Sequence, residues 1–169
     1  MYANFQTLFF ISIDYLKPVM IIQLKNETET IEIGARVASY LKGGEIIYLK
    51  GELGTGKTTF VRGVLNGLGH TGNVKSPTFT IVEQYSIDNH VIYHFDLYRL
   101  DDPEELESLG IRDYCDGQSI CFFEWPEKGG NLLPNADINL ELTYLENSRE
   151  VEFTSKSEVG KPILKQLSK

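Results

Sequence analysis

The stretch GELGTGKT, residues 51–58, decides the fold of this 169-residue chain. It fits the phosphate-loop pattern G-x-x-x-x-G-K-[ST] at every position. An apolar run just before it, within residues 45–50, is typical of a buried strand. Residues 58–68, just after it, predict a helix that ends at Gly69. A strand, a glycine-rich loop and a helix in this order predict an α/β domain with a site for phosphate groups.

Other segments extend this pattern in both directions. The sequence predicts a helix over 28–41, strands over 80–85, 90–95 and 119–123, a helix from 102 to 110, and an antiparallel hairpin that joins 138–144 to a strand around 151–153. The predicted fold class is therefore α/β, a P-loop NTPase-like mixed β-sheet flanked by helices, with a C-terminal antiparallel hairpin. We expect one domain over residues 20–155, an N-terminal extension over 1–19, and a polar tail over 156–169 that is at best partly ordered.

Composition and charge indicate which kinds of molecule this chain is able to bind directly. The net charge of −8 and the pI near 4.9 exclude a broad basic surface for nucleic acid, so we expect any RNA to be held by a partner. Cys115 and Cys121 lack the spacing of a zinc site and predict reduced thiols. An apolar stretch over 8–22 is interrupted by Asp14, Lys17 and Pro18, too early for a membrane span. We expect a cytoplasmic protein without membrane contact.

The chemistry of the loop follows from its residue types. Its glycines let backbone N–H groups point inward at a polyphosphate, next to the positive end of the following helix. Lys57 should reach the β and γ phosphates, Thr58 should offer its hydroxyl to Mg²⁺, and Thr59 should help to hold the α phosphate. The expected ligands are therefore ATP and Mg²⁺.

Carboxylates at strand ends are the candidates for metal orientation and water activation. Asp96 follows the strand over 90–95, and Glu124 follows the apolar run over 120–123. Either acid fits either role, and the spacing does not assign them. Ser76 and Thr78 flank Pro77 in a loop that is able to close over the γ phosphate.

Two further side chains have a binding and a structural interpretation. Trp125 either lies against the nucleotide or fills the core, and Arg149 either touches the nucleotide or is an ordinary surface arginine. The histidines show no metal-ligand spacing and are interpreted as structural. The predicted catalytic residues are Lys57, Asp96 and Glu124, and the predicted metal ligands are Thr58, Glu124 and Asp96. The predicted nucleotide-binding residues are Gly51, Glu52, Leu53, Gly54, Thr55, Gly56, Lys57, Thr58, Thr59, Thr78, Trp125 and Arg149.

Taken together, five motifs resemble those of the TsaE (YjeE) family of small bacterial ATPases. They are GELGTGKTTFVR (51–62), VKSPTF (74–79), HFDLYRL (94–100), DPEELESLG (102–110) and FEWP (123–126), and the likeness spans about 21–153. The resemblance implies magnesium coordination through Thr58 and Glu124 and a mechanistic role for Asp96. It also implies an ATPase of tRNA threonylcarbamoyladenosine (t6A) formation that docks onto TsaD and TsaB subunits. In that family ATP hydrolysis resets the transferase between turnovers.

Three other functions fit a phosphate loop. A small-molecule kinase is the main alternative, but such enzymes commonly bring arginines from a lid, and this chain has five arginines and no arginine-rich segment. A GTPase lacks support because the guanine-reading pattern Asn-Lys-x-Asp is absent. A module that binds ATP without hydrolysing it is the third.

Overall fold

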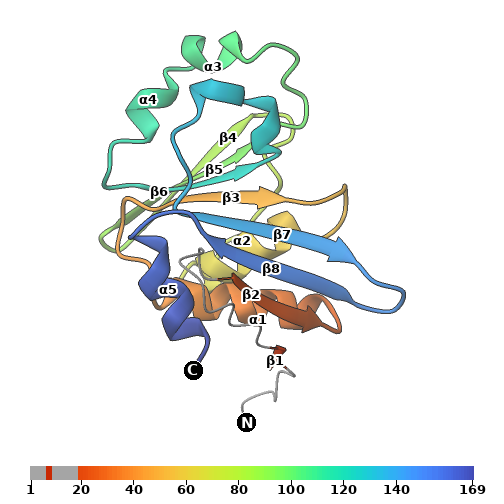
Figure 1. Cartoon of the computed structure of the whole chain (residues 1–169). Helices are drawn as coiled ribbons and strands as arrows, with labels where there is room; N and C mark the ends of the chain where they lie inside the picture. The colour runs from red at the N-terminus through yellow and green to blue at the C-terminus, as the bar shows by residue number, and fades with distance from the viewer. Residues whose placement is uncertain (1–6, 9–18) are drawn as a thin grey trace.

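One mixed sheet forms the centre of the molecule (Figure 1). The computed structural model describes residues 7–8 and 19–169, so the predicted extension over 1–19 lies almost wholly outside the described residues. Eight strands pair in the order β1-β2-β8-β7-β3-β6-β5-β4. They are β1 Thr7–Leu8, β2 Val19–Leu24, β3 Ile46–Lys50, β4 Val82–Ile87, β5 His90–Asp96, β6 Ile120–Glu124, β7 Ile138–Tyr144 and β8 Arg149–Ser155.

The predicted mixed sheet and C-terminal hairpin are confirmed. β3 is parallel to β6 and to β7, and β5 is parallel to β6. The pairs β7–β8, β2–β8 and β4–β5 are antiparallel. The strand before the phosphate loop is therefore central, with a parallel neighbour on each side, which is the buried environment that its apolar run indicates.

Five α-helices of the described part of the chain flank this sheet. They are α1 Glu27–Ala38, α2 Lys57–Gly67, α3 Glu104–Ser108, α4 Ile111–Tyr114 and α5 Gly160–Leu167, and two 3₁₀ turns cover Pro126–Lys128 and Gly130–Leu132. The side chain of Asn26 caps α1 by accepting from Glu29 N at 3.0 Å. Asp102 likewise accepts from Glu104 N at 3.0 Å, as its place before a proline and acids predicts.

Strand β6 separates two cores. Its residues are all buried, and because side chains alternate along a strand, successive residues enter opposite sides. Ile120 and Phe122 pack with α1, α2 and α5, whereas Cys121 and Phe123 pack with residues of α3 and α4. The sheet is therefore covered on both faces, with α1 and α2 on one face and α3 and α4 on the other (Figure 1).

Helices α1 and α2 approach each other closely at glycines. A Cβ added at Gly63 would lie 2.3 Å from Ile31 O, and one added at Gly34 would lie 2.5 Å from Phe60 O. Backbone therefore meets backbone at this crossing, which fixes α2, and with it the phosphate loop, against α1.

The expectation of a partly ordered tail is wrong. Residues 160–167 form α5, and Ile163, Leu164 and Leu167 are buried in the core shared with α1 and α2. These three positions lie on one face of a helix, and the burial of that face orders a segment whose composition is otherwise polar. The predicted division of the chain into an extension over 1–19, a domain over 20–155 and a tail over 156–169 stays a prediction.

The strand predicted over 80–85 starts later than expected. The backbone at Ile81 has φ 67°, a left-handed conformation that is rare for a β-branched residue. Ile81 N donates to Pro77 O at 2.7 Å and Ile81 O accepts from Asp96 N at 3.0 Å, so this residue belongs to the turn and β4 begins at Val82. The loop 76–81 is thereby tied to the end of β5.

In the part of the chain that the structure describes, no helix has the length and apolar character needed to cross a membrane.

Candidate functional site

The glycine-rich loop joins the end of β3 to the start of α2. Gly51 and Gly56 have φ 128° and 109°, which side chains rarely allow, and a Cβ at Gly51 would lie 2.3 Å from Leu142 O. Gly56 is the residue before α2, so the loop passes directly into the helix N-terminus. Free N–H groups and the helix dipole make this end of α2 suited to an anion.

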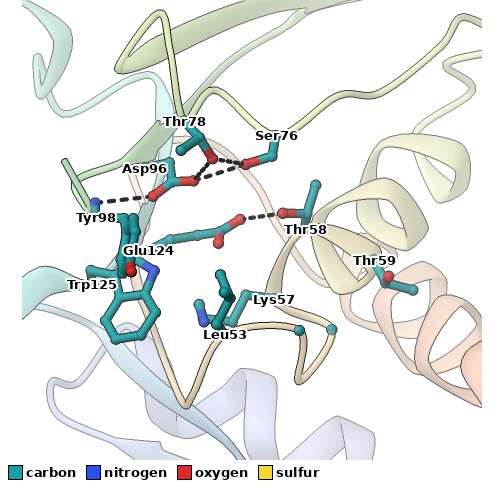
Figure 2. Close-up of a pocket in the computed structure, with 12 residues that line it drawn as sticks. Leu53, Lys57, Thr58, Thr59, Ser76, Thr78, Asp96, Tyr98, Glu124 and Trp125 are labelled. Atoms are coloured by element: carbon teal, nitrogen blue, oxygen red, sulfur yellow. Dashed lines mark hydrogen bonds between the residues drawn. The ribbon is translucent and has the colours of Figure 1, made fainter.

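A pocket of about 310 Å³ opens beside this loop (Figure 2). Three segments of the chain meet there: the phosphate loop with the first turn of α2, the loop after residue 74, and the carboxyl ends of β5 and β6. The lining residues are Leu53, Gly54, Gly56, Lys57, Thr58, Thr59, Ser76, Thr78, Asp96, Tyr98, Glu124 and Trp125.

Lys57 is buried at the floor of this site. Its Nζ donates to Gly51 O at 2.7 Å and to Glu52 O at 2.9 Å, and it lies 4.2 Å from the centroid of the Trp125 ring. Burial lowers the pKa of this ammonium group, and the nearby carboxylates, Glu124 first, oppose the effect. The loop therefore holds a cation in place before any phosphate arrives.

Glu124 ends β6 and faces the first turn of α2. Thr58 Oγ1 donates to Glu124 Oε1 at 2.8 Å, and His94 Nε2 lies 2.8 Å from the same oxygen (Figure 2 shows the first bond). The Glu124 side chain is only 5% exposed. A hydroxyl and a carboxylate are thus in contact at the mouth of the phosphate loop.

Asp96 ends the neighbouring strand β5, opposite Glu124 in the parallel register. Its Oδ2 accepts from Ser76 Oγ at 2.8 Å and from Thr78 Oγ1 at 2.6 Å, and its Oδ1 accepts from Tyr98 N at 3.1 Å. These bonds hold the loop that carries Ser76 and Thr78 over the pocket (Figure 2). Asp96 and Glu124, whose roles the sequence spacing left unassigned, are therefore adjacent.

The donor atoms fit magnesium better than a softer metal. Thr58 and Glu124 offer oxygen, and a Mg²⁺ ion bound with a nucleotide takes only one or two protein oxygens beside phosphate oxygens and waters. Within residues 7–8 and 19–169, no group of three or more His, Cys, Asp or Glu side chains is arranged to hold a metal by itself. Oxygen atoms of a bound phosphate would add to the ligands that Thr58 and Glu124 offer.

Most of the predicted nucleotide-site residues line the pocket, and four do not. Gly51 and Glu52 present their carbonyls to Lys57, and Thr55 is buried with its hydroxyl donating to Glu52 O at 2.9 Å. Arg149 begins β8, with its guanidinium 6.0 Å from the ring centroid of Tyr144. Its Nη1 lies 4.0 Å from the position of a Cβ on Gly56, close to the loop but outside the pocket lining.

Trp125 lies between the pocket and the core, and its contact with a nucleotide stays a prediction. The ring lines the pocket and also packs against the core on the α3 and α4 side. It lies 5.1 Å from the ring of Tyr98, and its backbone has φ 57°, in the left-handed region. The chain thus reverses sharply after Glu124, which turns the indole back towards Lys57 (Figure 2).

The sequence interpretation missed two residues of this site. Tyr98 lines the pocket, and His94, interpreted as structural, contacts Glu124. Alternation along β5 was an available signal for the histidine, because residues 94 and 96 share one face of a strand. Tyr98 lies beyond the strand, and although it belongs to the motif HFDLYRL, the sequence interpretation gave it no role.

Comparison with known proteins gives consistent results. The family model described as "Threonylcarbamoyl adenosine biosynthesis protein TsaE" matches residues 24–151. The tRNA threonylcarbamoyladenosine biosynthesis protein TsaE of Haemophilus influenzae is 54% identical over 123 residues, 73% of this chain and 78% of that protein. The protein of the same name from Bacillus subtilis is 39% identical over 131 residues, 77% of this chain and 82% of that protein. The crystal structure of YdiB from Bacillus subtilis superposes with a TM-score of 0.79 at 30% identity, covering 92% of this chain and 97% of that one.

Proposed function

Because this chain belongs to the TsaE family of tRNA threonylcarbamoyladenosine biosynthesis proteins, we propose that it binds and hydrolyses ATP for the complex that makes this modification. The observation that carries the proposal is the meeting of Lys57, Thr58, Asp96 and Glu124 at one pocket beside a phosphate loop. Loop, cation, hydroxyl and paired acids are the parts that phosphoryl transfer requires.

The loop and Lys57 bind the polyphosphate. Backbone N–H groups at the start of α2 donate to phosphate oxygens, and the ammonium of Lys57 stabilises the negative charge that gathers on the β and γ phosphates. Because Lys57 is already fixed by Gly51 O and Glu52 O, little reorganisation accompanies binding. A fixed cation stabilises a developing charge more than a mobile one does.

Thr58 and Glu124 would hold a magnesium ion, which would neutralise charge on the phosphate oxygens. The hydroxyl of Thr58 keeps lone pairs for a metal while it donates its hydrogen to Glu124, so the contact at 2.8 Å suits both partners.

An acid at the end of β5 or β6 activates the attacking water. The water oxygen attacks the γ phosphorus, the bond to the β–γ bridging oxygen breaks, and one water proton passes to the carboxylate. Asp96 lies beside the loop of Ser76 and Thr78, so that loop is placed to respond to the γ phosphate.

The structure supports a function as a small-molecule kinase less well than a function as an ATPase. All five arginines belong to the described residues, and none of them lines the pocket. Arg62 and Arg112 pair with surface glutamates, and Arg99 stacks on Phe79 at 4.1 Å. Transfer to a metabolite usually needs arginines from a lid, so water is the better supported acceptor.

Membership of the family and the net charge support a proposal about the partners. TsaD- and TsaB-type subunits carry out threonylcarbamoyl transfer, and this chain resets them between turnovers through ATP hydrolysis in the cytoplasm. Its net charge of −8 favours contact with tRNA through those subunits.

A reconstitution experiment tests the proposal. Purified chain is mixed with TsaD- and TsaB-type partners, tRNA, a threonylcarbamoyl donor and Mg²⁺–ATP, and both released phosphate and modified tRNA are counted. We expect the partners to stimulate phosphate release, and we expect repeated turnover to require the chain. Repeated turnover of equal extent without the chain, or with a chain that carries both Asp96→Asn and Glu124→Gln, would refute the proposal. Phosphate transfer to an added metabolite would instead support a kinase.

A further inference from the structure

His94 lies on β5 with its side chain fully buried, and among the described residues its side chain makes a polar contact with Glu124 alone. A carboxylate accepts hydrogen bonds, so the Nε2 atom at 2.8 Å from Oε1 carries the hydrogen and donates it. The imidazole of His94 therefore donates to Glu124. The other acid of the site, Asp96, lies two residues further along the same strand.

The second ring nitrogen of His94 is left without a partner. Nδ1 is buried and has no hydrogen bond to any described residue. An unpaired buried polar atom destabilises a fold, and a leucine or methionine of similar size would avoid it. Position 92 on the same face is a buried isoleucine, so an apolar side chain is compatible with this side of β5. The cost of the unpaired nitrogen therefore offsets part of the stability that the bond to Glu124 contributes, and the main effect of the histidine is on the carboxylate that it contacts.

The bond from His94 goes to the same oxygen that Thr58 contacts. Both donors engage Oε1 of Glu124, one from the strand beside it and one from the first turn of α2. Two donors on one oxygen fix the rotation of the carboxylate and leave Oε2 uninvolved in holding the side chain. Thr58 would share its hydroxyl with a bound metal. His94 has no second polar partner among the described residues, so its hydrogen bond serves Glu124 alone.

We propose that His94 is a positioning residue: its Nε2–H fixes the carboxylate of Glu124 beside Thr58 and thereby raises the magnesium affinity of the nucleotide-bound protein. This inference rests on the proposed function, because it concerns the metal that accompanies ATP. Residues that orient a metal ligand in this way typically change metal affinity or activity by about 10–100-fold when they are replaced.

Three variants of the full chain test the role. His94→Leu removes the donor and keeps the volume, His94→Gln retains a donor close to the position of Nε2, and His90→Gln alters a histidine on the same strand away from the pocket. Calorimetry measures the affinity for ATP by titration of ATP into protein in EDTA, and the affinity for Mg²⁺ by titration of Mg²⁺ into a mixture of protein and ATP. The melting temperature is measured without ligands.

We expect His94→Leu to weaken Mg²⁺ binding by about 10–100-fold while ATP affinity in EDTA stays within about twofold of the unmodified chain. His94→Gln should recover most of the loss, and His90→Gln should show none. The metal-free melting temperature of His94→Leu should stay close to that of the unmodified chain, because the loss of the unpaired nitrogen and the loss of one donor to Glu124 act in opposite directions. In an E124Q background the His94→Leu change should add no further loss of Mg²⁺ affinity.

The inference is overturned if His94→Leu binds Mg²⁺ as tightly as the unmodified chain. It is equally overturned if ATP affinity in EDTA and melting temperature fall in parallel with Mg²⁺ affinity, in His94→Leu and His94→Gln alike. If the unmodified chain binds no Mg²⁺–ATP at all, the proposed function fails first, and that result is distinct from either outcome.

Discussion

Replacement of Lys57 by alanine tests the proposed nucleotide site most directly. The ammonium group has three N–H donors, and two of them are directed at Gly51 O and Glu52 O, at 2.7 and 2.9 Å. One donor therefore remains for a phosphate oxygen without rearrangement of the loop. Lys57→Ala removes that donor together with the positive charge.

The expected size of the effect follows from this count. One hydrogen bond between charged groups contributes roughly 1.5–3 kcal/mol, and each 1.4 kcal/mol corresponds to about tenfold in affinity. We therefore expect Mg²⁺–ATP to bind Lys57→Ala about 10–150-fold more weakly. A larger loss would mean that the lysine leaves the loop carbonyls to make a second phosphate bond.

Isothermal titration calorimetry of Mg²⁺–ATP measures this difference. Lys50→Ala is the matched control, because it removes the same charge from the end of β3, next to a different pocket. Its affinity should stay within about threefold of the unmodified chain, since a charge outside the site is largely screened by salt. If Lys57→Ala binds Mg²⁺–ATP within threefold of the unmodified chain while its fold is intact, the assignment of the phosphate site is refuted.

Three other predictions concern stability, measured by urea unfolding. Gly63→Ala should lower the free energy of unfolding by about 1–3 kcal/mol, because the new Cβ would lie 2.3 Å from a carbonyl of α1. Leu164→Ala should lower it by about 2–5 kcal/mol, because this side chain of α5 is buried in the main core. Burial, with a smaller contribution from Cys115, raises the pKa of Tyr48 to about 12. Tyr48 therefore stays protonated in the native state where it ionises in the unfolded chain, so its contribution is complete below about pH 10 and is lost as the pH rises towards 12. Tyr48→Phe should make the fall in stability over this range less steep.

Each of these predictions has a control on the same element or of the same type. Asn66→Ala changes an exposed position of α2 and Gln166→Ala an exposed position of α5, and both should leave stability within about 0.5 kcal/mol. Tyr48→Phe is compared with the unmodified chain below about pH 10 as well, where Tyr48 is protonated in both the native and the unfolded state. Equal stability of Gly63→Ala and Asn66→Ala would contradict the close helix crossing, and an intact Leu164→Ala would contradict the docking of α5. Parallel alkaline curves for Tyr48→Phe and the unmodified chain would contradict the shifted pKa.

Local signals in the sequence were sufficient for most of the elements. The phosphate loop, the apolar strand before it and the alternation over 138–144 are patterns of neighbouring residues, and each element forms where these patterns place it. Both strand-end acids were identified for the same reason. Their adjacency was not, because the pairing of Asp96 with Glu124 is a contact between strands that are distant in sequence.

The remaining errors come from tertiary contacts. The polar composition of residues 156–169 concealed a short helix whose three apolar residues find a core made elsewhere. The left-handed turn at Ile81 is stabilised by its bonds to Pro77 and Asp96 and has no residue preference that would reveal it. His94 looked structural because its partner, Glu124, comes from another strand.

The pairing of β2 with β8 has a consequence for synthesis of the chain. Gln23 and Ser148 are hydrogen-bonded although they are 125 residues apart in sequence. At about 5–20 residues per second, a ribosome takes roughly 6–25 s to make the segment between them. During that interval β2 lacks its native neighbour β8. Its apolar side chains, which are Met20, Ile22 and Leu24, are not yet buried in the complete core. Folding of this sheet therefore finishes late in translation, and the interval before β8 emerges is when the nascent chain is most exposed to aggregation and to chaperones.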